Sequence, residues 1–583
     1  LQRLYGGSEP WLRSGGTLFS LQKLHDKAHI SGRDFHELTT AYEFLRKIEH
    51  RLQIRNGQQT HRLPQADADL VVLARAVSPQ ASNHDARRFV RSVEQRMEAV
   101  GAIYDRIIHG AQQEQAPESG ELVLTESPGG REFSERQMLQ RLAQDAPELF
   151  EIARRARLGS PERRNLVRFL TAAFTTAERY AAIVRSPHGV ERAMRLFQLS
   201  DFATSLLLTH PEEIATLDRL EPRHGREHTA SLLVDSGNGS WSDDPVFALI
   251  ASQETPQAEK LALLRQHFRQ RVFASVARDV IESRPVFASL AATTEAADEA
   301  IAAALAAISA PDGFAVLAMG RLGTREFDLL SDADLVFVRD PVLGAEEARR
   351  AAERLMNTLS AYTREGAVFA IDVRLRPRGT EGELVVTPAQ LTEYFRHEAA
   401  PWEALSFTKL RVVGGTADTG DAALQCVRGL SHRFADDSTF PGAVREMRAR
   451  LEQTGRTELN LKTSPGGMYD LDFIAKFLAV RSSLGVQNAN IRVRIQTLVE
   501  HRLLDVDLGA ELAGAGELIR TAEHAIRVAA GANRATLPLG DHARRATEEL
   551  TASFLGRIPE AGLEAELRKS MARVREIFDH VLR

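Results

Sequence analysis

The sequence predicts a mainly helical protein that contains one α/β domain, and two observations lead to this fold class. Ala, Leu, Arg and Glu dominate most of the 583 residues. Apolar side chains recur at four-residue spacing, as at Phe44, Ile48 and Leu52, which is typical of one face of a helix. Short apolar runs of the kind found in buried strands gather within residues 314–413.

The elements of this β-rich zone follow one another in a simple order. The apolar runs predict strands at 314–319, 334–338 and 368–375, with further edge strands at 384–386 and 410–413. Helical periodicity over 345–362 separates the second strand from the third. Strands interrupted by a helix predict an α/β insert between helical regions.

Breaks in composition divide the rest of the chain. Residues 112–130 are rich in Gln, Glu, Pro, Ser and Gly and predict a linker, and 221–244 predict a loop. Residues 1–111 are predicted to be the C-terminal part of a first helical domain, and 131–255 a helical region that leads into a second unit. The α/β domain is predicted over 256–430 and a C-terminal helical domain over 431–583.

A diverged repeat joins the two ends of the chain. Shifted by 474 positions, residues 22–64 match 496–538 without a gap, and Arg46, Glu49 and His50 fall on Arg520, Glu523 and His524. The period is too long for a solenoid. We interpret it as two copies of a large unit, an α/β domain followed by a helical bundle, and expect the first α/β domain to precede Leu1. The two Glu-His pairs are interpreted as helix-packing features rather than catalytic pairs.

Charge and cysteine content narrow the class of protein. The net charge of −5 indicates no general affinity for nucleic acid or anionic membranes. No apolar run approaches the roughly 20 residues that a membrane span needs. Cys426 is the single cysteine, so an intramolecular disulfide is excluded. We expect a protein of the reducing cytoplasm.

One stretch, residues 320–338, carries the residues typical of phosphate chemistry. Gly323 lies in a turn after the first strand, where a missing Cβ lets the backbone approach a phosphate, and Thr324 adds a hydroxyl donor. Asp332 and Asp334 follow two positions apart on the predicted strand, so their carboxylates share one face. Two hard oxygen ligands on one face suit Mg²⁺.

A third aspartate completes the candidate site. Asp372 lies within an apolar run, where a carboxylate is costly unless it is paired or coordinated. If its strand neighbours the second one, three carboxylates converge and can hold two metal ions for nucleotidyl transfer. Asp372 would act as general base or hold the metal at the nucleophile. Arg374 and Arg376 follow at alternate positions, either to neutralise phosphate or as surface ion-pair partners.

These motifs resemble a known family. Gly320-Arg-Leu-Gly, Ser331-Asp-x-Asp-Leu-Val-Phe and Ile371-Asp-Val-Arg-Leu-Arg-Pro are similar to the nucleotidyltransferase domain of glutamine synthetase adenylyltransferase/adenylyl-removing enzymes. The motifs that begin at Thr408 and Lys462 match further along the chain. Thr324, Asp472 and Lys476 depart from the family, which usually has glycine, glutamate and glutamine there.

The resemblance implies a polymerase β-like nucleotidyltransferase domain flanked by helical bundles. It implies a cytoplasmic enzyme of nitrogen metabolism that transfers AMP from ATP, with Mg²⁺, to a tyrosine of glutamine synthetase. Catalytic and metal-binding roles would fall on Asp332, Asp334 and Asp372. Nucleotide-binding roles would fall on Gly323, Thr324, Ser331, Arg374, Arg376 and Lys409.

In this multifunctional family, PII and glutamine are regulatory partners, and a separate N-terminal domain removes AMP by phosphorolysis. By order along the chain, the α/β domain here is similar to the second, adenylylating copy. Two alternatives stay open: a uridylyltransferase that modifies PII, and an inactive regulatory scaffold of the same fold.

Overall fold

The computed structural model describes residues 32–56, 63–64, 67–77, 85–108, 135–155, 160–174, 176–220, 245–361, 363, 365–452, 459–485 and 488–583. These residues form two compact units that divide between Arg136 and Gln137. The predicted linker 112–130 and the predicted loop 221–244 lie outside the described residues.

The first unit contains three described helices, α3 (Gly32–Asn56), α4 (Asp67–Val77) and α5 (Ala86–Ile108). They pack against one another around a small apolar core that includes Ile48, Leu52, Leu73 and Phe89. Ile48 and Leu52, two of the periodic positions in the sequence, are buried as a helix face requires.

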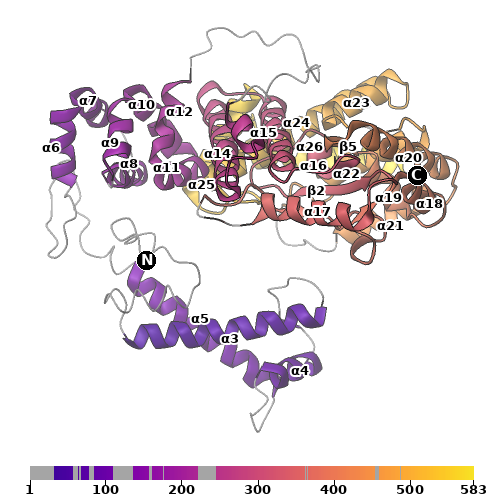
Figure 1. The fold of residues 1–583 in the computed structure, drawn as a ribbon, viewed down its shortest axis with the longest axis horizontal. Helices are drawn as coiled ribbons and strands as arrows, with labels where there is room; N and C mark the ends of the chain where they lie inside the picture. The colour runs from indigo at the N-terminus through magenta and orange to yellow at the C-terminus, as the bar shows by residue number, and fades with distance from the viewer. Residues whose placement is uncertain are drawn as a thin grey trace. The chain divides into compact units, whose positions relative to one another are not determined.

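The second unit begins with a run of helices that leads to the sheet (Figure 1). Their bounds are α6 (Glu135–Asp145), α7 (Pro147–Arg155), α8 (Ser160–Ala173), α9 (Ala177–Val184), α10 (Pro187–Leu199), α11 (Asp201–Thr209), η3 (Pro211–Glu213), α12 (Ile214–Asp218), α13 (Pro245–Ala251), α14 (Gln257–Glu282) and α15 (Val286–Ala307). α14 and α15 pack side by side, and α15 also contacts the sheet. The predicted boundary at 255/256 therefore falls just before α14.

Five short strands form one mixed sheet in the order β3-β2-β1-β5, with β4 also paired to β2. The strands are β1 (Phe314–Ala318), β2 (Ala333–Arg339), β3 (Ile371–Asp372), β4 (Val385–Val386) and β5 (Arg411–Gly415). β1 is antiparallel to β2 and β5, whereas β3 and β4 run parallel to β2. The predicted strand over 368–375 was too long, since only 371–372 pair and the chain then turns.

Helices cover both faces of this sheet. Alternate residues of β1 face opposite ways: Phe314 and Val316 pack with α15 and α17 (Ala345–Ser360), while Ala315 and Leu317 belong to the core shared with α20 (Ala417–Ala435). All five β1 side chains are buried. Burial on both faces explains why the strand reads as a continuous apolar run rather than an alternating one.

The remaining helices lie between the strands or follow β5 to the C-terminus. They are α16 (Gly320–Gly323), η5 (Gly379–Glu381), α18 (Pro388–His397), α19 (Pro401–Phe407), α21 (Phe440–Glu452), α22 (Met468–Arg481), α23 (Ile491–Glu500), α24 (Val506–Ala530), α25 (Asp541–Leu555) and α26 (Leu563–Val581). The predicted boundary at 430/431 falls inside α20. No helix in the described ranges is both long and apolar enough to cross a membrane.

The helices bear out the internal repeat. Adding 474 to the bounds of α3 gives 506 and 530, which are the bounds of α24. The same shift carries the start of α4 onto the start of α25, and α5 onto the stretch that contains α26. Both units therefore contain the same succession of three helices, as the sequence match predicts.

Candidate active site

The end of β1 and the turn after it shape the centre of the site. Gly320 opens α16 with a φ of +55°, a left-handed conformation that suits glycine. A Cβ added there would lie 1.9 Å from Oδ2 of Asp334. The backbone N–H of Met319 donates to the carbonyl oxygen of Asp334 at 2.8 Å. The turn therefore needs glycine because the Asp334 carboxylate occupies the space of a side chain.

Two of the three predicted carboxylates lie on neighbouring strands. Asp334 of β2 is paired in register with Asp372 of β3, and the two strands are parallel. Asp332 lies just before β2 and is exposed, whereas the other two are half-buried. The expectation that the strand of Asp372 neighbours the second strand is confirmed.

The pKa of Asp334 reflects its burial and the carboxylates beside it. Burial, followed by the charge of Asp372, raises the pKa of Asp334 to about 6, and Asp332 adds to the rise. Lys462 and Lys409 act in the opposite direction. A carboxylate with like charges beside it favours a bound cation or proton.

Asp372 is held by an arginine two residues further on. Both oxygens of Asp372 accept hydrogen bonds from the Arg374 guanidinium at 2.5–3.0 Å, and Oδ1 also accepts from the Arg374 backbone N–H at 2.8 Å. These bonds, chiefly those from the guanidinium, lower the pKa of Asp372. The Arg374 side chain is 72% exposed, so this cation is free to exchange Asp372 for another anion.

The donor set agrees in kind with a hard divalent cation, because carboxylate oxygens are the ligands that Mg²⁺ takes from proteins. Among the described residues, no group of three or more His, Cys, Asp or Glu side chains is arranged to hold a metal ion. What the fold sets in place is the pairing of the Asp334 and Asp372 positions on neighbouring strands.

Three of the predicted nucleotide-binding residues point into the protein. The N–H of Gly323 donates to Met319 within α16, and its missing Cβ makes room for the Lys409 carbonyl, 2.2 Å from the Cβ position. Thr324 is fully buried and donates to Glu326 at 3.0 Å. Ser331 accepts from Arg527 at 2.9 Å. Each stabilises the loop between β1 and β2.

Arg376 and Lys409, which were also predicted to bind nucleotide, are bonded to other groups of the protein. The guanidinium of Arg376 donates to three backbone carbonyls of the turn after β3, those of Val373, Thr380 and Gly382. It does not share a strand face with Asp372, because β3 ends at Asp372. Lys409 is buried, and its Nζ donates to Asp472 at 2.7 Å.

A buried network of charged side chains supports the loop that carries Asp332. Arg321 bridges Asp328 and Glu523 at 3.3 and 2.7 Å, so the loop is tied to α24. On α24, His524 Nδ1 lies 2.7 Å from Asp328, and Arg527 donates to Ser331, next to Asp332. These charges are paired inside the protein, which is what makes their burial tolerable.

Comparison with known proteins shows which families this chain is similar to. The model of glutamate-ammonia ligase adenylyltransferase matches residues 190–426, and that of GlnD PII-uridylyltransferase matches 1–108 and 440–582. Three relatives are each named bifunctional glutamine synthetase adenylyltransferase/adenylyl-removing enzyme. The Caulobacter vibrioides protein is 27% identical across 100% of this chain, that of Xanthomonas axonopodis pv. citri 29% across 81%, and that of Bordetella bronchiseptica 27% across 94%.

The chain is similar over most of its length to the glutamate-ammonia ligase adenylyltransferase family.

The chain spans between about half and two thirds of these relatives, 62%, 54% and 63% of their respective lengths. Within the adenylyltransferase family match, 190–426, lie the three carboxylates, the glycine turn and Lys409. The match therefore covers the whole α/β centre, while α24, which contributes Glu523, His524 and Arg527 to the network, falls in the second matched region.

The sequence did not predict the network behind this candidate site. Glu326, Asp328 and Arg321 lie in the same loop as the predicted residues, but the sequence did not predict that they are paired with α24. The feature that could have revealed the network is the repeated Arg-x-x-Glu-His pattern of α24, interpreted above as a helix-packing feature. Glu523 and His524 are buried and paired with other charged side chains, as helix packing would require.

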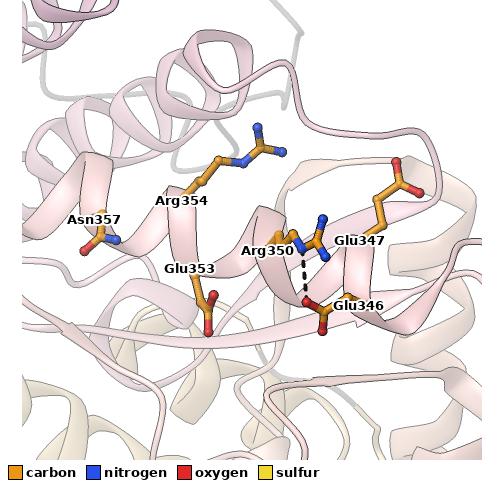
Figure 2. A pocket seen from close by; sticks show the side chains of 6 residues that line it. All are labelled: Glu346, Glu347, Arg350, Glu353, Arg354 and Asn357. Atoms are coloured by element: carbon orange, nitrogen blue, oxygen red, sulfur yellow. Dashed lines mark hydrogen bonds and ion pairs between the residues drawn. The ribbon is translucent and has the colours of Figure 1, made fainter.

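A surface hollow lies apart from these carboxylates. It is lined by the exposed face of α17, with Glu346, Glu353 and Arg350 among its side chains (Figure 2). Arg350 pairs with Glu346 at 3.0 Å, as i,i+4 residues of a helix do. None of the three aspartates lines it. A substitution in this hollow is therefore a suitable control for substitutions of the aspartates.

Proposed function

We propose that this chain transfers AMP from ATP to a tyrosine of glutamine synthetase and releases pyrophosphate. The observation that carries the proposal is the pairing of Asp334 with Asp372 on neighbouring parallel strands, beside a turn that Gly320 makes possible. The match to the adenylyltransferase family model and the names of the relatives support the same reaction.

In this proposal Asp332, Asp334 and Asp372 hold magnesium. The raised pKa of Asp334 supports this role, because the neighbouring negative charges are what a cation would relieve. Magnesium bound there would neutralise the triphosphate and lower the pKa of the attacking hydroxyl.

The transfer exchanges one P–O bond for another. The tyrosine oxygen forms a bond to the α-phosphorus, the bond to the β-phosphate bridge breaks, and pyrophosphate leaves with that electron pair. The hydroxyl proton passes to a carboxylate of the site. Asp372 lies at the nucleophile side, and Arg374 must turn from it toward phosphate as ATP arrives, which its exposure permits.

The other nucleotide-binding residues act by shaping the site. Gly323, Thr324 and Ser331 set the loop between β1 and β2, and Arg376 sets the turn after β3. Lys409 lies on the other side of β1 from Asp334 and supplies positive charge.

The proposal extends to regulation in the cytoplasm by PII and glutamine. It is supported by the match of residues 1–108 and 440–582 to the model of GlnD PII-uridylyltransferase. The same match supports one alternative, transfer of UMP to PII, although it leaves out the carboxylates of the α/β centre.

One experiment separates these functions. The chain is incubated with Mg²⁺ and glutamine synthetase plus ATP labelled in the α-phosphate, and in parallel with PII plus labelled UTP. We expect label on the synthetase, and none when Asp334→Asn replaces the chain. Label on PII alone would support uridylyl transfer, and label on neither target would support the inactive scaffold.

A further inference from the structure

A buried cluster of cationic side chains lies where α22, α23 and the residues just before β5 meet. Lys409 lies just before β5. Asp472 and Lys476 belong to α22, and Arg494 belongs to α23. Oδ2 of Asp472 lies 2.7 Å from both Lys409 Nζ and Lys476 Nζ, and Oδ1 lies 2.8 Å from Arg494 Nη1. All four residues are at least nine-tenths buried.

The cluster has too few anions for its cations. Three positive side chains share the single carboxylate of Asp472, and the next carboxylate, Glu326, is bonded to Arg520 through both oxygens. Within the described part of the chain, Nε and Nη2 of Arg494 are buried without a hydrogen-bond partner. Buried donors and charges without partners are costly, so the cluster is better suited to a bound anion than to an empty site.

The sheet brings this cluster next to Asp334. Ala318 at the end of β1 pairs with Leu335 on one side and with Arg411 on the other. Asp334 and Lys409 therefore flank the Gly320–Gly323 turn, about two strand spacings, or roughly 10 Å, apart. Glycines in this turn touch both, since a Cβ on Gly323 would meet the Lys409 carbonyl and one on Gly320 the Asp334 carboxylate.

Electrostatics agree with this placement. Burial, only partly offset by Asp472, lowers the pKa of Lys409 to about 7. Lys409 in turn lowers the pKa of Asp334. An additional anion between them would restore the ammonium form of Lys409.

We propose that Lys409, Lys476 and Arg494 form the subsite for the β- and γ-phosphates of the nucleotide and for the pyrophosphate that leaves. The inference rests on nucleotidyl transfer at Asp334 and Asp372. As the bond between the α-phosphorus and the bridging oxygen breaks, the electron pair moves onto pyrophosphate, and preplaced cations stabilise that charge. Asp472 holds the three cations together and competes with the incoming anion.

The test measures binding of inorganic pyrophosphate by calorimetry in EDTA, so that no metal contributes. Lys476→Gln and Arg494→Gln should each weaken binding about tenfold or more, the loss expected for one charge-assisted contact. The matched control is Arg492→Gln, an exposed arginine on the same helix that pairs with Glu517, and it should bind as the unaltered chain does.

Asp472→Asn provides a result of opposite sign. Removal of the competing carboxylate should tighten pyrophosphate binding, whereas a purely structural cluster predicts no gain. AMP, which lacks the β- and γ-phosphates, should bind equally to the unaltered chain and to Lys476→Gln, while ATP should bind the variant more weakly. Should Arg494→Gln fail to fold by circular dichroism, Lys476→Gln and Asp472→Asn carry the test.

The outcomes separate this inference from the proposed function. Pyrophosphate binding that is unchanged in Lys476→Gln and not tightened in Asp472→Asn would overturn the subsite, even if glutamine synthetase is labelled. Cluster-dependent pyrophosphate binding without label on the synthetase would support the subsite and overturn the proposed target.

Discussion

Asp334 is a carboxylate whose surroundings oppose its charge. It is half-buried, it pairs in register with Asp372, and its carboxylate occupies the space that a Cβ on Gly320 would need. Its pKa of about 6 means that the folded protein favours the protonated form more than the unfolded chain does. Residues selected for chemistry often reduce stability in this way.

Replacing Asp334 should therefore separate activity from stability. Asp334→Asn and Asp332→Asn should each reduce AMP transfer by about 10²-fold or more, the scale of losing a group that stabilises the transition state. In EDTA near pH 8, Asp334→Asn should raise the free energy of unfolding, by on the order of 2 kcal/mol, because the neutral amide removes the repulsion. Urea titration and label transfer measure the two effects.

Near-normal transfer in both variants would contradict the metal-site assignment. Glu353→Gln, in the hollow on α17, is the control and should leave transfer and ATP binding unchanged, since its side chain is exposed and none of the three aspartates lines that hollow.

Asp372 should act on turnover more than on nucleotide binding. We expect Asp372→Asn to lower kcat about 10²-fold or more and to change the affinity for ATP much less, because a group at the nucleophile acts mainly in the transition state. Steady-state kinetics with ATP and glutamine synthetase measure the split. Weaker ATP binding at an unchanged kcat would place Asp372 on the substrate phosphates.

At the scale of elements, α24 supports the loop between β1 and β2. Two non-glycine residues of this loop, Arg325 and Leu330, have φ values of +56° and +59°, which an isolated loop would disfavour. Arg527 and His524 of α24 hold the segment around Leu330 through Ser331 and Asp328. The position of Asp332 thus depends on a helix nearly 200 residues further along the chain.

His524 should make this support sensitive to alkaline pH. Its charge is opposed by burial but stabilised by Asp328 and by Asp279, whose Oδ2 lies 3.3 Å from Nε2, so its pKa is raised to about 9. Arg527 and Arg321 also face Asp328, and Arg284 faces Asp279. A raised histidine pKa stabilises the fold fully below the unfolded value of about 6.5, and this stabilisation is lost as pH rises to about 9.

The free energy of unfolding should accordingly fall between pH 6.5 and 9, with a contribution from His524 on the order of 3 kcal/mol. His524→Gln should unfold more easily at pH 6.5 and should lack this part of the pH dependence. Denaturant titrations of both proteins across the window measure the difference. Parallel pH profiles would show that His524 is neutral in the folded protein.

At the scale of the whole molecule, the same three helices occur in both compact units. α24, α25 and α26 are packed with the α/β domain in the second unit, and α3, α4 and α5 repeat them in the first with their own core. The carboxylates, the network and the cationic cluster all lie in the second unit.

Residues 131–583 should therefore be sufficient for transfer. We expect this shorter chain, which keeps α6 whole, to unfold cooperatively and to label glutamine synthetase at a rate comparable to that of residues 1–583. Circular dichroism and label transfer measure both properties. A folded but inactive shorter chain would mean that residues 1–130 contribute to the site or to recognition of the target.

The sequence by itself determined the helical class, the α/β insert, the order of its strands and the repeat, because hydrophobic spacing and a constant offset are local, readable properties. It also singled out Asp332, Asp334 and Asp372, since carboxylates beside apolar strands have few inexpensive explanations. It mistook the turn after Asp372 for strand, because Val373 and Leu375 continue the apolar alternation while their backbone turns away from β2.

Only the tertiary structure decided which polar groups are available at the site. Thr324 and Ser331 read as phosphate ligands, yet Glu326 and Arg527 already engage them. Lys476 differed from the family pattern and Arg494 attracted no notice, but the sequence could not show that both share Asp472 with Lys409, some 60 to 85 residues away along the chain. Charge pairing acts through space and depends on burial, so it emerges only when the strands and helices are packed together.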